Sequence, residues 1–256
     1  MTQAPKILFL DIETAPNLSY VWGQYEQNVI AHEREWYLLC VGYRWYGKKK
    51  TQCVALPDFE KEYKRDPEDD SRLAQVMWEL VDSADIIIGH NGDRFDLRKL
   101  NARFLAHDFP PPRSYKTIDT LKVARKYFML NSNKLGDIGQ YLNLGGKEDT
   151  GGFKTWAGCM RGEPAAWRTM IKYCKKDVDL LIDVYERLKP WMTNHPNLNV
   201  YTKQDGCPTC GHHDLTRRGN RYTQTYAYTQ FQCKRCGAYS KLRTRDKAAD
   251  APTIVP

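Results

Sequence analysis

The sequence predicts an α/β protein, in which a mixed sheet is flanked by helices and a small β domain follows. Two observations support this fold class. Strand-like apolar runs come first and then alternate with helical segments, which is typical of a mixed sheet covered by helices. Four of the eight cysteines lie in two C-x-x-C pairs near the C-terminus, which indicates a small separate domain. A chain of 256 residues is long enough for one sizeable core and such an appendage.

The strands are predicted from short apolar runs. Residues 7–10 ("ILFL") give the first buried strand, and residues 36–46 and 51–56 give two more on either side of the turn-forming "GKKK". A fully apolar run at residues 85–89 ("DIIIG") and a brief strand at the start of "YKTIDTLKVARKYF" complete the sheet.

The helices are predicted from apolar residues that recur at intervals of three and four. The clearest is a long amphipathic segment at residues 164–188. A second helix follows the brief strand in residues 115–128 and is capped near Asp119 or Thr120. Three further helices are expected at residues 71–81, 95–105 and 134–142.

The composition, with 41% hydrophobic and 27% charged residues, is that of an ordinary globular protein, and no run is long enough to span a bilayer. Without a secretory signal at the N-terminus we expect a cytoplasmic protein, in which paired cysteines bind metal rather than form disulfides. The net charge of +8 is concentrated from Pro196 onward, where ten Lys and Arg stand against four Asp and Glu. This favours a polyanionic partner, although a merely soluble basic tail would have the same composition.

The first strand ends in two acids, Asp11 and Glu13, whose side chains point the same way and should repel each other. Two further acids complete the pattern. Asp96 follows the strand at 85–89, and Asp177 lies one helical turn after Tyr173. Divalent cations replace such repulsion with coordination, and oxygen ligands without His or Cys favour Mg²⁺ or Mn²⁺. The acids therefore predict two metal ions that would hold the attacking and leaving oxygens of a phosphoryl displacement.

Three motifs occur in this order, "DIE" (11–13), "HNGDRFD" (90–96) and "YCKKD" (173–177), and they resemble the motifs of DEDD-type 3′–5′ exonucleases. The Tyr-x-x-x-Asp form of the third motif resembles the DEDDy branch, which includes proofreading domains of DNA polymerases and free-standing phage exonucleases. The segment "SNKLGDIGQYLNL" is also similar to polymerase-B-like exonucleases. The resemblance spans residues 6–188 and implies a ribonuclease H-like fold.

The resemblance implies a role for each motif residue. Asp11 would bridge two Mg²⁺ or Mn²⁺ ions, Glu13 and Asp177 would complete the site of the ion that activates water, and Asp96 would assist the second ion largely through water. Tyr173 would orient the attacking water, since its hydroxyl is not expected to deprotonate near neutral pH. The residues expected to contact the terminal nucleotide are Thr14 and Ala15 through their backbone, together with Asn91 and Phe95.

Each of these residues also has a plainer interpretation when it is taken alone. Asp177 would be a solvated surface charge, Tyr173 a packing residue and Asp96 a helix cap. The pair Asp11 and Glu13 is harder to explain in this way, because two acids at the end of a buried strand have no structural purpose. Taken jointly, the motifs favour a metal site.

The two cysteine pairs, "CPTC" and "CKRC", are separated by 22 residues, and each is followed by glycine. Such knuckles fit a tetrahedral structural site for one Zn²⁺. A redox-active pair is the alternative. The expected zinc ligands are Cys207, Cys210, Cys233 and Cys236, and the other cysteines, Cys40, Cys53, Cys159 and Cys174, are predicted to be ordinary buried thiols.

Between the knuckles the chain resembles a zinc ribbon, and we expect a β-hairpin that turns at residues 219–220, with Tyr222, Tyr226 and Tyr228 on one strand face. Aromatic rings that stack on bases, among cations that follow the phosphates, suit a single-stranded nucleic acid. The alternative is that these tyrosines simply pack a very small domain. The residues predicted to contact nucleic acid are Arg221, Tyr226, Tyr228 and Arg235.

Together the motifs imply a metal-dependent 3′–5′ exonuclease that releases nucleoside monophosphates. The expected partners are single strands or 3′ ends, of DNA by analogy with proofreading domains, with RNA left open. A separate DNA polymerase or another replication or repair protein is a further expected partner, and a membrane is not. A phage-encoded protein would act in the host cytoplasm. Two alternatives stand beside this reading: an RNA-trimming or structure-selective nuclease on the same fold, and a catalytically silent zinc-ribbon adaptor that binds nucleic acid.

The domain limits are predicted from a polar, turn-rich segment at residues 193–206. They place the nuclease domain at residues 1–195, a linker at 196–203 and the zinc ribbon with its basic tail at 204–256. Residues 17–35 are an insertion near the expected cleft without a predicted structure.

Overall fold

The computed structural model describes residues 4–23, 25, 28–146 and 150–246. The chain divides into two compact units, Lys6–Val184 on the one hand and Met1–Pro5 with Tyr185–Pro256 on the other. The division falls inside the long helix α7 (Pro164–Leu188), which has the bounds that its amphipathic pattern predicted. The domain limits at residues 195 and 204 stay predictions.

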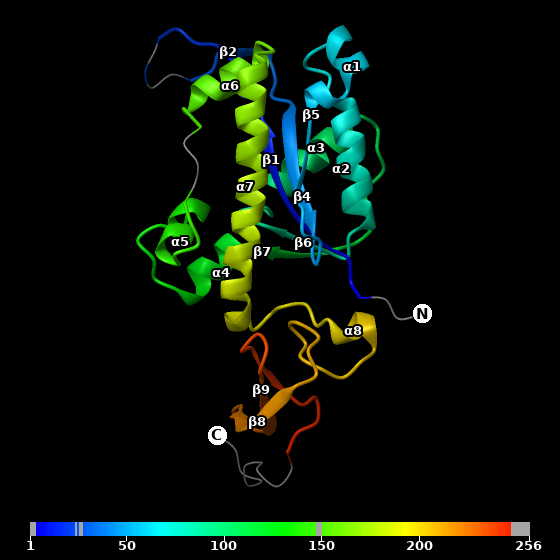
Figure 1. Ribbon diagram of the computed structural model, residues 1–256, viewed down its shortest axis with the longest axis vertical. Helices are drawn as coiled ribbons and strands as arrows, with labels where there is room; N and C mark the ends of the chain where they lie inside the picture. Colours follow the sequence, from blue (N-terminus) through cyan, green and yellow to red (C-terminus); the bar gives the residue numbers. More distant parts are fainter. Residues whose placement is uncertain (1–3, 24, 26–27, 147–149, 247–256) are drawn as a thin grey trace. The chain divides into compact units, whose positions relative to one another are not determined.

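The first unit is built on a five-stranded mixed sheet with the order β5-β4-β1-β6-β7 (Figure 1). On one side β1 (Ile7–Thr14) is antiparallel to β4 (Leu38–Trp45), which is antiparallel to β5 (Gln52–Ala55). On the other side β1 is parallel to β6 (Ile86–Gly89), which is parallel to β7 (Lys116–Asp119). The predicted α/β class and its mixed sheet are thus confirmed.

Successive side chains of β1 point to opposite faces of the sheet. Leu8, Leu10 and Ile12 are buried in a core that also contains apolar residues of α2 and α3. Asp11 and Glu13 lie on the opposite face, where α7 runs along the sheet (Figure 1). The first strand therefore holds its acids on the face that α7 covers.

Helix α7 packs tightly against the sheet at Gly42 on β4. A Cβ atom at this position would lie 2.8 Å from the carbonyl oxygen and 2.9 Å from the Sγ of Cys174, and 3.0 Å from Val178 Cγ2. Only glycine leaves room for such an approach. One turn further along the helix, the Asp179 carboxylate accepts a hydrogen bond from Arg44 of β4 at 3.0 Å, which fastens the same face.

The remaining elements largely follow the predicted order. Helix α4 begins at the predicted cap, since Asp119 Oδ1 accepts a hydrogen bond from Leu121 N at 3.0 Å. Three elements were not predicted: the antiparallel pair β2 (Leu18–Tyr20) and β3 (Ala31–Arg34), and helix α6 (Phe153–Met160), which precedes α7. The other helices are η1 (Leu56–Asp58), α1 (Glu60–Arg65), α2 (Ser71–Ser83), α3 (Asp96–Ala106), α4 (Thr120–Tyr127), α5 (Leu135–Tyr141), η2 (Lys189–Trp191) and α8 (Asn199–Thr202). Of the helices in the described ranges, none has both the length and the apolar character that crossing a bilayer requires.

The second unit contains a three-stranded antiparallel sheet with the order β10-β9-β8, formed by β8 (Leu215–Tyr222), β9 (Ala227–Cys233) and β10 (Tyr239–Lys241). The hairpin turn predicted at residues 219–220 is wrong. Gly219, with φ of 72°, lies within β8 at a bulge, and the chain reverses at residues 223–226. A Gly-Asn pair is typical of a turn, but here the left-handed conformation of Gly219 forms a β-bulge instead.

The shifted turn also changes which tyrosines share a face. Tyr222 pairs with Ala227, whereas Tyr228 pairs with Arg221, so Tyr222 and Tyr228 lie on opposite faces of the hairpin. Tyr226 lies in the turn itself. The prediction that the three tyrosines share one strand face is therefore wrong, whereas Arg221 and Tyr228 are direct neighbours.

Candidate active site

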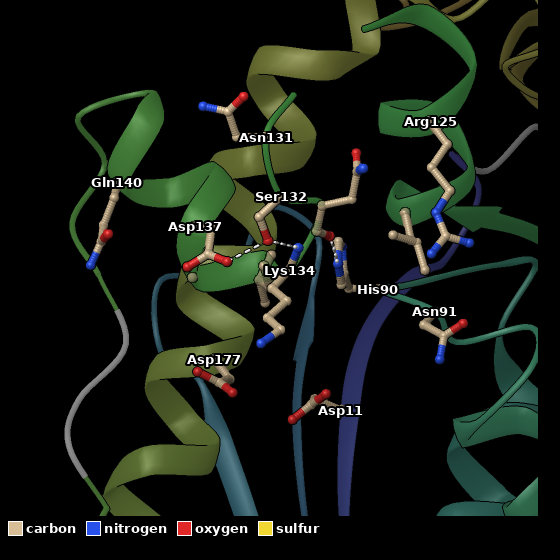
Figure 2. Close-up of a pocket in the computed structure, with 14 residues that line it drawn as sticks. Asp11, His90, Asn91, Arg125, Asn131, Ser132, Lys134, Asp137, Gln140 and Asp177 are labelled. Carbon is tan, nitrogen blue, oxygen red and sulfur yellow. Dashed lines mark hydrogen bonds between the residues drawn. The ribbon is translucent and has the colours of Figure 1, made fainter. Parts of the chain in front are cut away.

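Three carboxylates predicted as metal ligands converge in the first unit. One oxygen each from Asp11, Glu13 and Asp177 lies within 4.8 Å of the other two. Asp11 and Glu13 come from one face of β1 and Asp177 from α7, and Figure 2 shows Asp11 and Asp177 on facing elements. Three acids this close repel unless a cation lies among them, and carboxylate oxygens are the ligands that Mg²⁺ and Mn²⁺ prefer. The acidic triad could therefore hold metal ions.

The burial of Asp177 separates it from the neighbouring acids of its helix. Its side chain is 4% exposed, so the alternative of a solvated surface charge is wrong for this residue. Asp179, two residues later, instead pairs with Arg44 and holds the helix on the sheet. The same helix thus uses one acid for the triad and another for packing.

Asp96 does not belong to this close group of described residues, although the sequence predicts it as a ligand. Its side chain is 2% exposed, and Oδ1 accepts a hydrogen bond from Ile12 N at 3.0 Å. Strand β1 pairs with β6 only at residues 7–9, so Asp96 supplies Ile12 with the acceptor that a longer β6 would provide. Burial raises the pKa of Asp96 to about 7, and the Asp119 carboxylate adds to the shift. Its role as a metal ligand stays a prediction.

Tyr173 lies one turn before Asp177 on the same face of α7 and is 8% exposed. Its ring contacts that of Trp156 edge to face, with centroids 6.1 Å apart. Burial, followed by the carboxylates of Asp177 and Glu13, raises the pKa of Tyr173 well above the ordinary value of a phenol. The hydroxyl is therefore protonated at any physiological pH and can act as a hydrogen-bond donor beside the triad.

A polar cavity of about 600 Å³ opens onto Asp11 and Asp177. Its opposite wall comes from α4, α5 and the loop between them, with Arg125, Asn131 and Lys134 among the lining residues. In Figure 2 the Lys134 side chain extends toward the two carboxylates. No short motif marks Arg125 or Lys134 in the sequence. The similarity of residues 132–144 to polymerase-B-like exonucleases was a signal for Lys134, and Arg125 had none.

The motif around Asn91 supports this cavity. His90 Nε2 donates to the carbonyl oxygen of Asn133 at 2.9 Å, and Nδ1 lies 2.9 Å from the Thr120 hydroxyl, so His90 ties the end of β6 to the cavity wall. Asn91 adopts a left-handed conformation with φ of 64°, and its N–H donates to Asp119 Oδ1 at 2.9 Å. Asn91 lines the cavity, and its contact with substrate stays a prediction.

A second cavity of about 600 Å³ has an aromatic lining that includes the predicted contacts Thr14, Ala15 and Phe95. Lys99 Nζ lies 3.8 Å from the centre of the Trp36 ring and 3.1 Å from Thr14 Oγ1. The N–H of Ala15 is already donated to the carbonyl oxygen of Tyr37, so its predicted backbone contact with a nucleotide would have to use another atom. The rings of Phe95, Trp36 and Trp156 offer apolar surface for a base, and neither tryptophan was predicted to do so.

The four cysteines of the second unit converge as predicted. The Sγ atoms of Cys207 and Cys236 are 3.6 Å apart, as are those of Cys210 and Cys233. A tetrahedral zinc site with Zn–S bonds of about 2.3 Å requires sulfur atoms about 3.8 Å apart, so the cluster suggests Zn²⁺. The glycines that follow the knuckles, Gly211 and Gly237, have positive φ and donate their N–H groups to Cys207 and Cys233 respectively.

Cations lie over two tyrosine rings of this unit. Lys241 Nζ is 3.3 Å from the centre of the Tyr228 ring, and the Arg245 guanidinium is 4.8 Å from that of Tyr226. Arg221 and Arg235 are exposed. Three of the four predicted contact residues are thus exposed and Tyr228 is partly buried, and contact with nucleic acid stays a prediction for each of them.

Comparisons with known proteins agree with this arrangement. A family model described as the RNase_H superfamily matches residues 8–189. No curated protein matches the chain. Among solved structures, the family B DNA polymerase from the hyperthermophilic archaeon Pyrobaculum calidifontis is similar, with a TM-score of 0.55 and 14% identity. The similarity covers 87% of this chain and 32% of the polymerase, and at this identity it shows a shared fold.

Proposed function

This chain belongs to the RNase_H superfamily, and from that premise we propose that it is a metal-dependent 3′–5′ exonuclease that hydrolyses DNA to nucleoside monophosphates. The observation that carries the proposal is the convergence of Asp11, Glu13 and Asp177 within 4.8 Å, with Tyr173 one helical turn away. The similar fold of a polymerase and the order of the three sequence motifs favour exonuclease chemistry over other reactions of the superfamily.

The donor set fits two Mg²⁺ or Mn²⁺ ions, because it consists of carboxylate oxygens without a histidine or a thiol side chain among them. Asp11, Glu13 and Asp177 would hold the ions, with Asp96 as the fourth predicted ligand. Such ions lower the pKa of bound water and neutralise charge on the phosphate during in-line displacement.

The side chains around the triad would position the reactants. The protonated hydroxyl of Tyr173 would hold the attacking water by a hydrogen bond, because its raised pKa rules it out as a base. The Lys134 ammonium, which extends toward Asp11 and Asp177, would attract the phosphate and offset its charge. Positioning of this kind accounts for much of the catalysis in phosphoryl transfer.

The aromatic cavity of the first unit and the three-stranded sheet of the second unit would each bind the substrate. Bases of a single strand would stack on Phe95 and Trp36, while Lys99 contacts the backbone beside Thr14. In the second unit, the Tyr228 ring beside Arg221 and Lys241 provides the same combination of stacking surface and positive charge. Both surfaces suit a single strand better than a rigid duplex.

Degradation of end-labelled oligonucleotides tests the proposal. With Mg²⁺ or Mn²⁺, a 5′-labelled DNA single strand should shorten one nucleotide at a time, and a 3′-labelled strand should release labelled mononucleotide at once. The Asp11→Ala variant should keep the fold and much of the binding but lose cleavage. Attack from the 5′ end would contradict the proposed polarity.

Two other outcomes select the alternatives. Cleavage of RNA strands but not of DNA strands would identify an RNA-trimming nuclease on the same fold. Tight binding without cleavage, in either metal and on single- and double-stranded substrates alike, would identify a silent adaptor.

A further inference from the structure

Three cysteines outside the zinc ribbon come together on the sheet face that carries the acidic triad. The Sγ atoms of Cys40, Cys53 and Cys174 all lie within 4.8 Å of one another. Cys40 and Cys174 are fully buried, whereas Cys53 is partly exposed. The sequence predicts ordinary buried thiols here, because the three residues are far apart in the chain and form no C-x-x-C pair.

The fold brings these thiols together through strand register and the close approach of α7. Cys40 pairs with Ala55 and Gly42 with Cys53 across β4 and β5, so Cys40 and Cys53 are diagonal neighbours on one face. The missing side chain of Gly42 lets Cys174 descend onto this face, where its Sγ would lie 2.9 Å from a Cβ atom at position 42. Three separate elements, β4, β5 and α7, thus each contribute one thiol.

We propose that Cys40, Cys53 and Cys174 form a second thiolate site for a soft divalent cation, Zn²⁺, distinct from both the zinc ribbon and the acidic triad. Thiolates select Zn²⁺ over the Mg²⁺ or Mn²⁺ of the carboxylates, so the two sites differ in metal although they lie on the same face of the sheet. In the described part of the chain no fourth cysteine, histidine or carboxylate joins the cluster. Three protein ligands with water in the fourth position are an established arrangement for zinc, and the exposed edge of Cys53 gives water access.

Such an ion would tie α7 to the sheet beside the catalytic strand. Cys174 lies three residues before Asp177, and its Sγ atom lies 3.7 Å from the carbonyl oxygen of Asp11. Cys40 is the cross-strand partner of Glu13. Because the ion binds only the folded arrangement, its occupancy stabilises the spacing between the elements that carry the triad.

Titration with Co²⁺ of protein that carries one Zn²⁺ per chain tests this site without relying on nuclease activity, since the first Zn²⁺ fills the four-cysteine cluster, which offers one thiolate more than the proposed site. Co²⁺ does not displace Zn²⁺ from the four-cysteine ribbon, because it binds thiolates more weakly, and on carboxylates it gives no sulfur-to-metal charge-transfer band. We expect one equivalent of Co²⁺ to produce that ultraviolet band in the wild type. The band should be lost in Cys53→Ala, which changes a partly exposed residue of an edge strand, and kept in Cys159→Ala, which removes a buried thiol outside the cluster.

Metal analysis provides the second measurement. After dialysis against free Zn²⁺ with excess Mg²⁺, the wild type and Cys159→Ala should each hold one zinc per chain more than Cys53→Ala. Equal zinc contents in all three proteins, or a wild type that gives no charge-transfer band with Co²⁺, would overturn the proposal. The wild-type titration decides the matter even if Cys53→Ala fails to fold.

Discussion

Replacing Gly42 with alanine should reduce stability and activity together. The new Cβ would lie 2.8 Å from the carbonyl oxygen of Cys174, and an ordinary contact begins at 3.4 Å, so α7 must move away from β4 by about 0.6 Å. The contact includes backbone as well as the Cys174 thiol, so a side-chain rotation cannot relieve it. The cost of such overpacking is about 2 kcal/mol, which lowers the melting temperature of a unit of this size by roughly 4–8 °C.

The same displacement should affect catalysis, because Asp177 moves with α7 while Asp11 and Glu13 stay on β1. A misplacement of about 1 Å can cost about a hundredfold in rate, so a shift of about 0.6 Å should cost about tenfold. The assay compares initial rates on 5′-labelled single-stranded DNA in Mg²⁺, well below the melting temperature, with thermal unfolding followed by circular dichroism.

A matched control separates the loss of stability from the loss of geometry. In Gly158→Ala the new Cβ would lie 2.6 Å from Ala166 Cβ, so this variant is overpacked where α6 meets the start of α7, away from β4. It should lose stability to a similar extent but keep more of its rate than Gly42→Ala. A Gly42→Ala protein with wild-type melting temperature and wild-type rate would refute the reasoning that links this glycine to the triad.

Three further variants test other parts of the structure. Tyr173→Phe should fold normally and lose roughly tenfold to a hundredfold in rate. Because the raised pKa keeps the hydroxyl protonated, the pH–rate profile of the variant should run parallel to that of the wild type between about pH 7 and 10. A break in this range that the wild type shows and the variant lacks would show that the phenol titrates. Cys207→Ser should release zinc, as measured by metal analysis, and should raise KM for DNA far more than it lowers kcat in steady-state kinetics. An unchanged KM would show that the four-cysteine domain does not contribute to substrate binding. Asp70→Asn should lower the free energy of unfolding by about 3–5 kcal/mol. The reason is that the buried Asp70 carboxylate accepts hydrogen bonds from Arg103 at 2.5 Å and from His107 at 2.7 Å. An unchanged midpoint of urea unfolding would contradict this prediction.

Much of the fold was predictable because its signals are local. Apolar runs predicted the strands at residues 7–10 and 85–89, and the spacing of apolar residues gave the bounds of α7. The turn of the cysteine-bound hairpin was not predictable in this way, since the same left-handed glycine serves a turn or a bulge and only strand register decides between them.

The candidate site likewise combines residues that local patterns predict with residues that only long-range contacts bring together. Asp11 and Glu13 were predictable from alternation on one strand, and Asp177 from its place in a recognisable motif. The cavity wall with Lys134, the aromatic cavity with Trp36 and the cluster around Cys174 depend on contacts between distant segments, which a single sequence does not reveal.

The short pairing of β1 with β6 has a consequence for how this site could be lost. Beyond residue 9 the two strands no longer pair, and the Asp96 side chain accepts the hydrogen bond from Ile12 N that a β6 residue would otherwise accept. Asparagine at this position would keep an oxygen for that amide while abolishing the charge, whereas alanine would abolish both. If the proposed nuclease chemistry were lost in a descendant, positions 11 and 13 could change first, whereas an acid or amide at position 96 would still be needed for the fold.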